Sequence, residues 1–267
     1  LCKSDLFHVI DMDDDLTLLD ITQYEWIIFG WHGIPINKYY NNPKHDFYKK
    51  KIDNLETSKQ VQDKIRILLQ IKNKAILVQD MHTQDYFGGL DNFCNYIKIN
   101  RIKKIITPYY CIEQINYIKQ NCHEIDICHI PHHIDETKFK DWGLNKDIDI
   151  LLFGNDHKLF YPFRHRIMNL LLNNKDKFKI HHIPKPRNYF RYNDKISNEN
   201  LSKLINRSWL TLCTSSKYDF LLGKYFETSM SNSVVFGNMA TDGNNIWENN
   251  YIHIDNNMTD DEIIDIL

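Results

Sequence analysis

Two carboxylic residues, Asp219 and Glu227, lie eight positions apart between two apolar segments. The pattern around them predicts a buried strand over 209–213, a polar loop, a helix that begins near 224 and a second buried strand over 234–237. In such a βαβ unit, the loop and the N-terminus of the helix lie at the carboxyl edge of a parallel sheet, where open α/β folds bind their ligands. We therefore expect the two carboxylates to lie at a binding site.

Basic side chains accompany this unit and indicate an anionic ligand. Residues 150–230 carry 14 Lys and Arg against six Asp and Glu, although the whole chain of 267 residues has a net charge of −2. Arg164 lies near the start of a predicted helix, where an arginine can clamp a phosphate group, and Lys158 lies in the preceding loop. Lys224 precedes Glu227 by about one helical turn. These cations predict a phosphate site; the alternatives are a solvated surface of mixed charge and a surface Lys–Glu helix pair.

His82 is the candidate group for accepting a proton. It follows a predicted strand over 75–78, and Asp80 precedes it by two residues. A histidine at the carboxyl end of a parallel strand faces the ligand cleft, where it could orient or deprotonate a hydroxyl group. His32, in a turn-rich loop after another predicted strand, is a weaker candidate of the same kind. The alternative for both is a structural role.

Other ligand-binding patterns are weak or absent. The glycine patterns GxGxxG and GxxxxGK[ST] do not occur, which argues against a Rossmann dinucleotide site and a P-loop. The aspartates of the run 11–15 could hold Mg²⁺ or Mn²⁺ against a diphosphate, or form a solvated acidic loop. Cysteines and histidines gather over 122–133, but a predicted strand over 125–130 points Cys128 and His129 to opposite faces. We therefore expect no metal site.

Apolar segments that alternate with helical patterns predict two successive α/β domains. The strands are predicted over 6–10, 24–30, 75–78, 102–107, 125–130, 148–153, 178–183, 209–213, 234–237 and 251–254. The helices are predicted over 58–72, 90–99, 111–121, 162–173, 201–207, 224–230 and from 259 onward. The polar segment 131–147 separates the two series, and we place the boundary so that the domains are 1–140 and 141–267. No apolar run is long enough to span a membrane, and the scattered cysteines are typical of reduced thiols.

Three segments of the second half resemble the nucleotide-sugar-binding half of GT-B glycosyltransferases, in particular the glycosyl transferases group 1 type of CgeB-like spore-maturation proteins. They are DILLFGN at 149–155, YPFR at 161–164 and KYFETSMSNSVVFG at 224–237. The first half is similar as well, through ILVQDMH at 76–82, KKIITP at 103–108 and ICHIPHHID at 127–135. The resemblance implies the α/β GT-B fold, in which two Rossmann-like domains face each other across a cleft. The first domain would bind the acceptor and the second the nucleotide sugar.

The resemblance also implies roles for single residues. Glu227 matches the second Glu of the family's EX7E motif, which binds the donor ribose. Asp219 stands where the first Glu would be, with a side chain one methylene shorter. Arg164 and Lys158 match the diphosphate-binding Arg and Lys, although the family's spacing is not reproduced, and His82 is similar to the cleft histidine of the first domain. The donor-binding set is completed by Gly154, Ser215, Ser216, Tyr218 and Lys224.

The predicted function is transfer of a sugar from a nucleotide-diphosphate sugar to an acceptor hydroxyl, with retention of configuration. Cationic side chains and a helix N-terminus can stabilise the departing diphosphate, so we expect no metal and no cofactor. His82 and Asp219 would act at the reacting groups. The acceptor would be a glycan, a protein or a small molecule, and the near-neutral net charge argues against general nucleic-acid binding. We expect a cytoplasmic enzyme, which a virus or its host could encode.

Three alternatives stay open at this level. The first is a non-catalytic module, derived from a glycosyltransferase, that holds a nucleotide or a glycan; the short length and Asp219 favour it. The second is a metal-dependent transferase that uses the aspartates of 11–15, and sensitivity to a chelator would identify it. The third is a nucleic-acid-modifying transferase that uses the basic, aromatic segment 184–195. Salt-sensitive DNA binding would identify that one.

Overall fold

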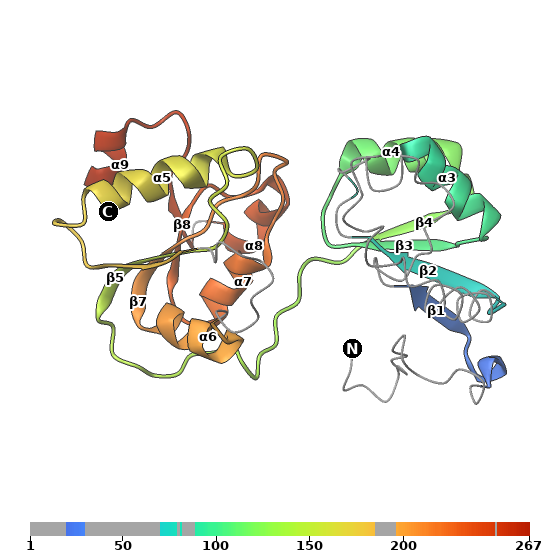
Figure 1. The fold of residues 1–267 in the computed structure, drawn as a ribbon, viewed down its shortest axis with the longest axis horizontal. Coiled ribbons are helices and arrows are strands. Elements are labelled where there is room, and N and C mark those ends of the chain that lie inside the picture. The colour runs from blue at the N-terminus through green and yellow to red at the C-terminus, as the bar shows by residue number, and fades with distance from the viewer. Residues whose placement is uncertain (1–19, 30–69, 79–80, 82–88, 185–195, 249) are drawn as a thin grey trace, which may run out of the picture. The chain divides into compact units, whose positions relative to one another are not determined.

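The computed structural model describes residues 20–29, 70–78, 81, 89–184, 196–248 and 250–267. The chain divides into two compact units, Leu1–Ile130 and Pro131–Leu267, each built around one parallel sheet (Figure 1). This confirms the predicted α/β class with two parallel sheets. The GT-B arrangement of the two sheets across a cleft remains a prediction.

The sheet of the first unit has its described strands in the order β1-β2-β3-β4, all parallel. The strands are β1 (Trp26–Phe29), β2 (Asn73–Leu77), β3 (Lys104–Thr107) and β4 (Asp126–His129). A 3₁₀ turn, η2 (Ile21–Gln23), precedes β1, and α3 (Leu90–Ile99) and α4 (Ile112–Asn121) lie on one side of the sheet (Figure 1). Ile76 and Ile105 of the sheet and Ile118 of α4 are completely buried. They place the core of this unit between the sheet and its helices.

In the described part of the second unit, the sheet has five parallel strands in the order β6-β5-β7-β8-β9. They are β5 (Ile148–Phe153), β6 (Ile180–Ile183), β7 (Ser208–Leu212), β8 (Val234–Gly237) and β9 (Ile252–His253). The strand order reverses between β5 and β7, because β6 pairs with the other edge of β5. Loops that leave two such strands diverge to opposite faces, and open α/β folds bind ligands in the resulting crevice. The topology therefore places the ligand edge at the carboxyl ends of β5 and β7.

Helices cover both faces of the second sheet (Figure 1). One face carries α5 (Pro162–Asn173) and α9 (Asp260–Ile266), and the other carries α6 (Asn198–Asn206), α7 (Gly223–Met230) and α8 (Asn244–Trp247), which follows the 3₁₀ turn η8 (Thr241–Gly243). On the first face, Leu212 and Phe236 pack with Ile167 of α5. On the second face, Val235 packs with Tyr225 of α7. Buried strands with apolar residues on both faces are typical of a parallel sheet between two helical layers.

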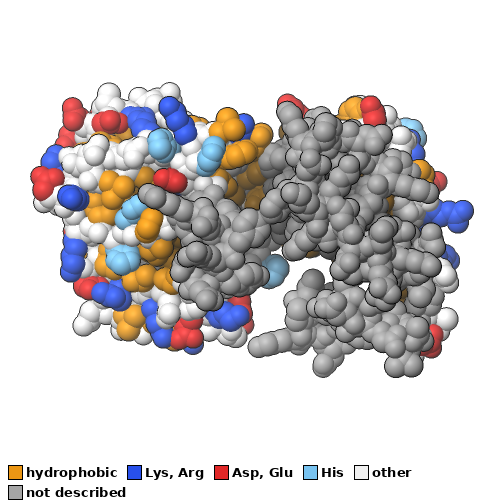
Figure 2. All heavy atoms as spheres, in the orientation of Figure 1, with side chains coloured by type: hydrophobic (Ala, Val, Ile, Leu, Met, Phe, Trp, Pro, Cys, Tyr) orange, Lys and Arg blue, Asp and Glu red, His pale blue; other side chains and the backbone are white. Residues whose placement is uncertain are grey.

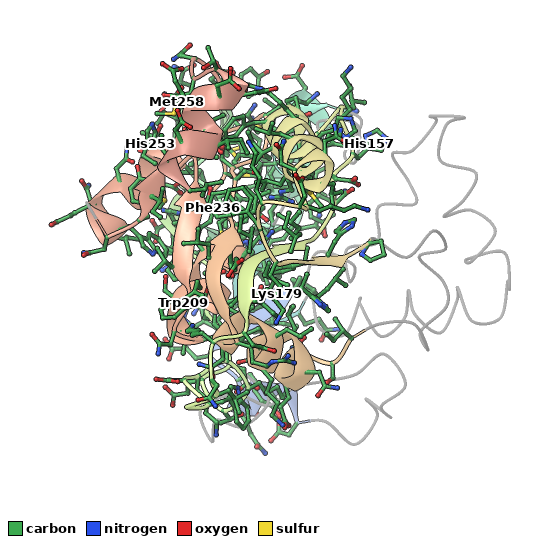
Figure 3. The ribbon with its side chains drawn as sticks, turned by 90° about the vertical axis from the view of Figure 1, so that its left-hand side faces the viewer. His157, Lys179, Trp209, Phe236, His253 and Met258 are labelled. Carbon is green, nitrogen blue, oxygen red and sulfur yellow. The ribbon has the colours of Figure 1, made fainter. Side chains whose placement is uncertain are left out.

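Figure 3 shows the two ends of the second sheet from the side. His157, which follows β5, and His253, at the end of β9, lie toward the top of the view, where the strands end. Trp209 and Lys179, near the starts of β7 and β6, lie toward the bottom. Phe236 of β8 lies between the two ends. The carboxyl edge, where the topology places a ligand, is therefore the upper one in this view.

Gly237, the last residue of β8, lies where the backbone leaves no room for a side chain. Its φ is +145°, and a Cβ added there would lie 1.7 Å from the carbonyl oxygen of Cys213. The backbone on either side is fixed, because the Cys213 N–H donates to Phe236 O at 2.8 Å and the Ile254 N–H donates to Gly237 O at 3.1 Å. A glycine is therefore required for the close approach of β8 to the end of β7.

Segment 131–147 belongs to the second unit. The Trp142 indole N–H donates to the Ser202 hydroxyl of α6 at 2.9 Å. The predicted boundary between domains 1–140 and 141–267 lies inside this segment.

Most element predictions agree with the structure to within a few residues. The predicted strand 148–153 and helix 162–173 coincide with β5 and α5. The helix predicted to start at 201 begins three residues earlier, because the Ser197 hydroxyl caps it by accepting a hydrogen bond from the Asn200 N–H at 3.2 Å. The strand predicted over 6–10 lies outside the described residues, as does nearly all of the helix predicted over 58–72.

Two further findings concern the described residues alone. None of their helices is both long and apolar enough to cross a membrane. Their cysteines, Cys94, Cys111, Cys122, Cys128 and Cys213, are free thiols, as predicted.

Candidate functional site

The loops that follow β5 and β7 meet at the carboxyl edge of the second sheet. The Lys217 N–H, in the loop after β7, donates to Phe160 O, in the loop after β5, at 2.9 Å. The Lys217 ammonium lies 5.6 Å from the centre of the Phe160 ring. These contacts bring together the two loops on which the predicted donor-binding residues lie.

Arg164 is buried in the first turn of α5, and its hydrogen bonds join the loop after β5 to the loop after β7. It is 3% exposed, and its guanidinium lies 4.2 Å from the centre of the Tyr161 ring. Its Nε donates to Thr214 Oγ1 at 3.0 Å and its Nη2 to Thr214 O at 2.8 Å, while Nη1 donates to Asn155 O at 2.9 Å. Three of the five guanidinium N–H groups are thus used by the protein, which leaves one on each Nη. Burial lowers the pKa of Arg164, but an arginine stays charged.

Lys224 enters the same region from the first turn of α7. Its Nζ donates to Phe153 O at 2.6 Å and lies 4.0 Å from the centre of the Phe153 ring. The side chain is 7% exposed, and burial, with the nearby charge of Arg164, lowers the pKa of Lys224 to about 7. The surface Lys–Glu pair considered as an alternative is therefore not formed, because the lysine points into the protein.

Gly154 lies next to both basic side chains. Its φ is +96°, and a Cβ added there would lie 3.5 Å from Arg164 Nη1 and 3.7 Å from Lys224 Nζ. Among the described residues, no carboxylate forms an ion pair with either cation. Two buried basic groups therefore lie next to Gly154, at the point where the strand order reverses.

Glu227 lies one turn further along α7 and is half-buried. Burial raises the pKa of its carboxyl, and Lys224 partly offsets this shift. No hydrogen bond to this carboxylate is formed by the described part of the chain. A half-buried acceptor of this kind can bind hydroxyl groups of a ligand.

Ser215 is held by Asn238, which the sequence did not single out. Asn238 Nδ2 donates to Ser215 Oγ at 2.7 Å, and the Ser215 N–H donates to Asn238 Oδ1 at 3.3 Å. The Tyr225 hydroxyl donates to Asn238 O at 2.5 Å. Because Ser215 Oγ accepts from Asn238, its own hydroxyl proton is available to another acceptor. The Ser216 hydroxyl accepts from the Tyr218 N–H at 3.2 Å and so shapes the same loop.

Asp219 connects the loop after β7 to the loop after β8. Its carboxylate Oδ2 accepts hydrogen bonds from the Thr241 N–H at 3.1 Å and from the Thr241 hydroxyl at 2.5 Å. Its φ of 57° is in the left-handed region, and the side chain is exposed. Tyr218 beside it stacks on Phe220 with the ring centres 5.7 Å apart. The structure therefore gives Asp219 a loop-bracing contact, and a contact with a sugar remains a prediction.

The remaining candidates lie apart from this cluster or outside the described residues. Lys158 is exposed in the turn between β5 and α5. His82, His32 and the aspartates of 11–15 lie outside the described residues. Within the described ranges, no group of His, Cys, Asp and Glu could hold a metal ion.

The surface of the second unit carries charges of both signs. Figure 2 shows Lys and Arg side chains interspersed with Asp and Glu over its visible face. Arg164 and Lys224, in contrast, are buried.

Sequence patterns missed several groups of the site. The structure adds the Phe153 carbonyl and the side chains of Thr214 and Asn238. The one available signal was position, because Thr214 and Asn238 directly follow predicted buried strands.

No family model and no curated protein matches the chain. Among solved structures, it is similar to the pneumococcal O-GlcNAc transferase GtfA in complex with UDP and GlcNAc. The two share 13% sequence identity with a TM-score of 0.42, over 74% of this chain. The chain spans 45% of the length of that transferase. The resemblance to CgeB-like glycosyltransferases remains a prediction from its motifs.

Proposed function

We propose that the second unit binds the diphosphate of a nucleotide sugar and that the protein transfers the sugar to an acceptor hydroxyl. The observation that carries this proposal is the pair of buried basic groups, Arg164 and Lys224, beside Gly154 at the strand-order reversal. Burying the permanent cation of Arg164 without a counter-charge is unfavourable, and its charge also opposes a charge on the neighbouring Lys224. A diphosphate would supply the missing negative charge.

The N-terminus of α7 supports the same ligand. Its N-cap residue, Leu222, has no side chain that can accept hydrogen bonds from the first turn. The Tyr225 N–H donates to Leu222 O at 3.2 Å, whereas the Gly223 and Lys224 N–H groups form no hydrogen bond within the described part of the chain and can favour an anion. Lys224 lies in this turn, so the same segment supplies the helix N-terminus and the buried amine.

Glu227 supports a ribose next to the diphosphate. It lies one turn from Lys224, and its carboxylate can accept hydrogen bonds from two neighbouring hydroxyl groups. In this proposal, Arg164, Lys224 and α7 stabilise the charge that develops on the departing diphosphate without a metal ion. His82 would accept the proton of the acceptor hydroxyl, and the sugar would be transferred with retention.

A non-catalytic nucleotide-binding module is the second candidate function. The contact between Asp219 and Thr241 favours it, because that carboxylate already accepts two hydrogen bonds from the protein. Both functions require the same donor site. They differ in whether the bound sugar is released or transferred.

A thermal-shift panel of UDP, GDP, ADP, CMP and their sugars tests the site. A ligand at about 100 times its Kd stabilises the native state by about 2.7 kcal/mol. This corresponds to a rise in Tm of roughly 5–10 °C for a unit of this size. We expect at least one nucleotide to give a shift of this order. Hydrolysis or transfer of the stabilising sugar nucleotide, in the presence of a chelator, would then distinguish a metal-independent enzyme from a binding module.

Variants of Glu227 test the ribose contact. Glu227→Ala and Glu227→Gln should weaken nucleotide binding by about 10–100-fold, since hydrogen bonds to charged groups contribute about 1.5–3 kcal/mol. Glu199→Ala is the matched control, because Glu199 is exposed on α6 and pairs with Lys203. If no nucleotide stabilises the wild type, or if the two Glu227 variants bind as tightly as Glu199→Ala, the proposed donor site is wrong.

A further inference from the structure

We propose that, above neutral pH, Lys224 is mostly neutral in the ligand-free protein and takes up a proton when a diphosphate binds, so that binding of the anion is coupled to proton uptake. The inference rests on the proposed function, because it assigns the diphosphate to this edge of the sheet. It adds a coupling between ligand binding and proton uptake that the presence of two basic residues does not by itself require.

The surroundings of Lys224 Nζ accommodate a neutral amine. One N–H donates to Phe153 O at 2.6 Å, and the ring of Phe153 covers the group at 4.0 Å. Both contacts favour a cation, but burial and the charge of Arg164 oppose it. The carbonyl and the ring supply only partial charges, whereas Arg164 is a full positive charge and burial removes the solvation of the amine, so the pKa of Lys224 is lowered to about 7.

The other groups that face Lys224 do not supply a fixed counter-charge. Arg164, from α5, repels a second cation. Cys213, at the end of β7, stays a neutral thiol because burial raises its pKa. Glu227, from α7 itself, attracts Lys224 but forms no ion pair with it among the described residues. A bound diphosphate would therefore be the first full negative charge in contact with the amine.

The sign of the pH dependence follows from this arrangement. Above about pH 7 the amine of the empty site is mostly neutral, so binding of the anion must take up a proton. Affinity therefore falls as the pH rises from about 7, and it levels off below that pH. Between pH 7.0 and pH 8.5 the loss is on the order of tenfold, and it approaches tenfold per pH unit well above the pKa of the empty site.

Isothermal titration calorimetry with UDP and GDP at pH 8.0 measures the coupling. The titrations are run in two buffers with different ionisation enthalpies, and the difference in heat gives the number of protons taken up. At this pH the terminal phosphates are already ionised and contribute almost nothing, since their second pKa is about 6. We expect the wild type to take up roughly 0.9 proton per nucleotide bound, from a free-site pKa near 7.

Variants assign the proton to Lys224. Lys224→Met removes the amine and should abolish the uptake, with native folding checked by circular dichroism. Lys224→Arg carries a permanent charge and should bind without uptake. Glu227→Gln should keep the uptake, which excludes Glu227 as its source, and Lys203→Met on exposed α6 is the matched control with unchanged uptake and affinity.

The outcomes separate this inference from the proposed function. Binding of UDP or GDP with no proton uptake, or with equal uptake in the wild type and in Lys224→Met, overturns the role of Lys224 and leaves the donor site in place. Absence of binding by both nucleotides, in calorimetry and in the thermal-shift panel, overturns the proposed function and the inference with it.

Discussion

The Gly237→Ala variant is expected to lose about 4 kcal/mol of stability or more, which is a large part of the total for a domain of this size. The added Cβ would lie 1.7 Å from Cys213 O and 2.8 Å from the carbonyl carbon of the same residue. These are backbone atoms, so no side-chain rotation can relieve the overlap. Any shift of the backbone lengthens the Cys213–Phe236 or the Gly237–Ile254 hydrogen bond.

Gly143→Ala is the control for backbone conformation alone. Gly143 has a φ of +64°, and a Cβ added there meets nothing within 4 Å. It should therefore cost only the strain of a left-handed alanine, about 1–2 kcal/mol. Urea denaturation followed by circular dichroism measures both variants. Equal loss of stability in the two would show that β7 and β8 do not approach each other as described.

The Arg164→Met variant is expected to lose about 1–3 kcal/mol of stability, because it leaves buried hydrogen-bond acceptors without donors, and to bind nucleotide diphosphates too weakly to detect. The substitution removes three hydrogen bonds and leaves the carbonyl oxygens of Asn155 and Thr214 without these donors. It also removes the permanent cation of the site. Denaturation in urea measures the first effect, and calorimetry with UDP and GDP under native conditions measures the second.

Arg166→Met is the matched control on the same helix. Arg166 pairs with Asp260 at 2.7 Å on a largely exposed surface, where such pairs contribute about 0–1 kcal/mol. It also donates to Met258 O, so we expect a small loss of stability and unchanged nucleotide binding. If Arg164→Met denatures and binds like Arg166→Met, the central role of Arg164 is wrong.

The sequence predicted the elements of the second unit because each carries a strong local signal. The apolar runs that form β5, β7 and β8 and the helical spacing of α5 need no knowledge of distant residues. The carboxyl-edge rule then placed Gly154, Ser215 and Lys224 at one edge, as the structure has them.

The contacts of these side chains could not be predicted in the same way. Lys224 and Glu227 have the spacing of a surface ion pair, but the packing of Tyr225 of α7 on Cys213 and Val235 turns the lysine toward Phe153 instead. The link between Arg164 and Thr214 depends on β5 and β7 being neighbours. That strand order is a long-range property, which no local pattern encodes.

Asp219 illustrates a different limit of sequence reasoning. Its spacing from Glu227 suggested a contact with the sugar, whereas its left-handed backbone brings its carboxylate to Thr241. A positive φ at an aspartate leaves no trace in the residue types around it. Its role in catalysis therefore has to be tested by activity and not by spacing.

Hydrogen exchange with and without UDP or GDP tests the location of the donor site most directly. We predict slower exchange, with either nucleotide bound, in the segments 153–165 and 213–228, which carry Gly154, Arg164, Lys224 and the N-terminus of α7. Segments 174–184 and 250–258, which contain the strands β6 and β9, should change little. Unchanged exchange in 153–165 and 213–228 while a nucleotide is bound would contradict the proposed site.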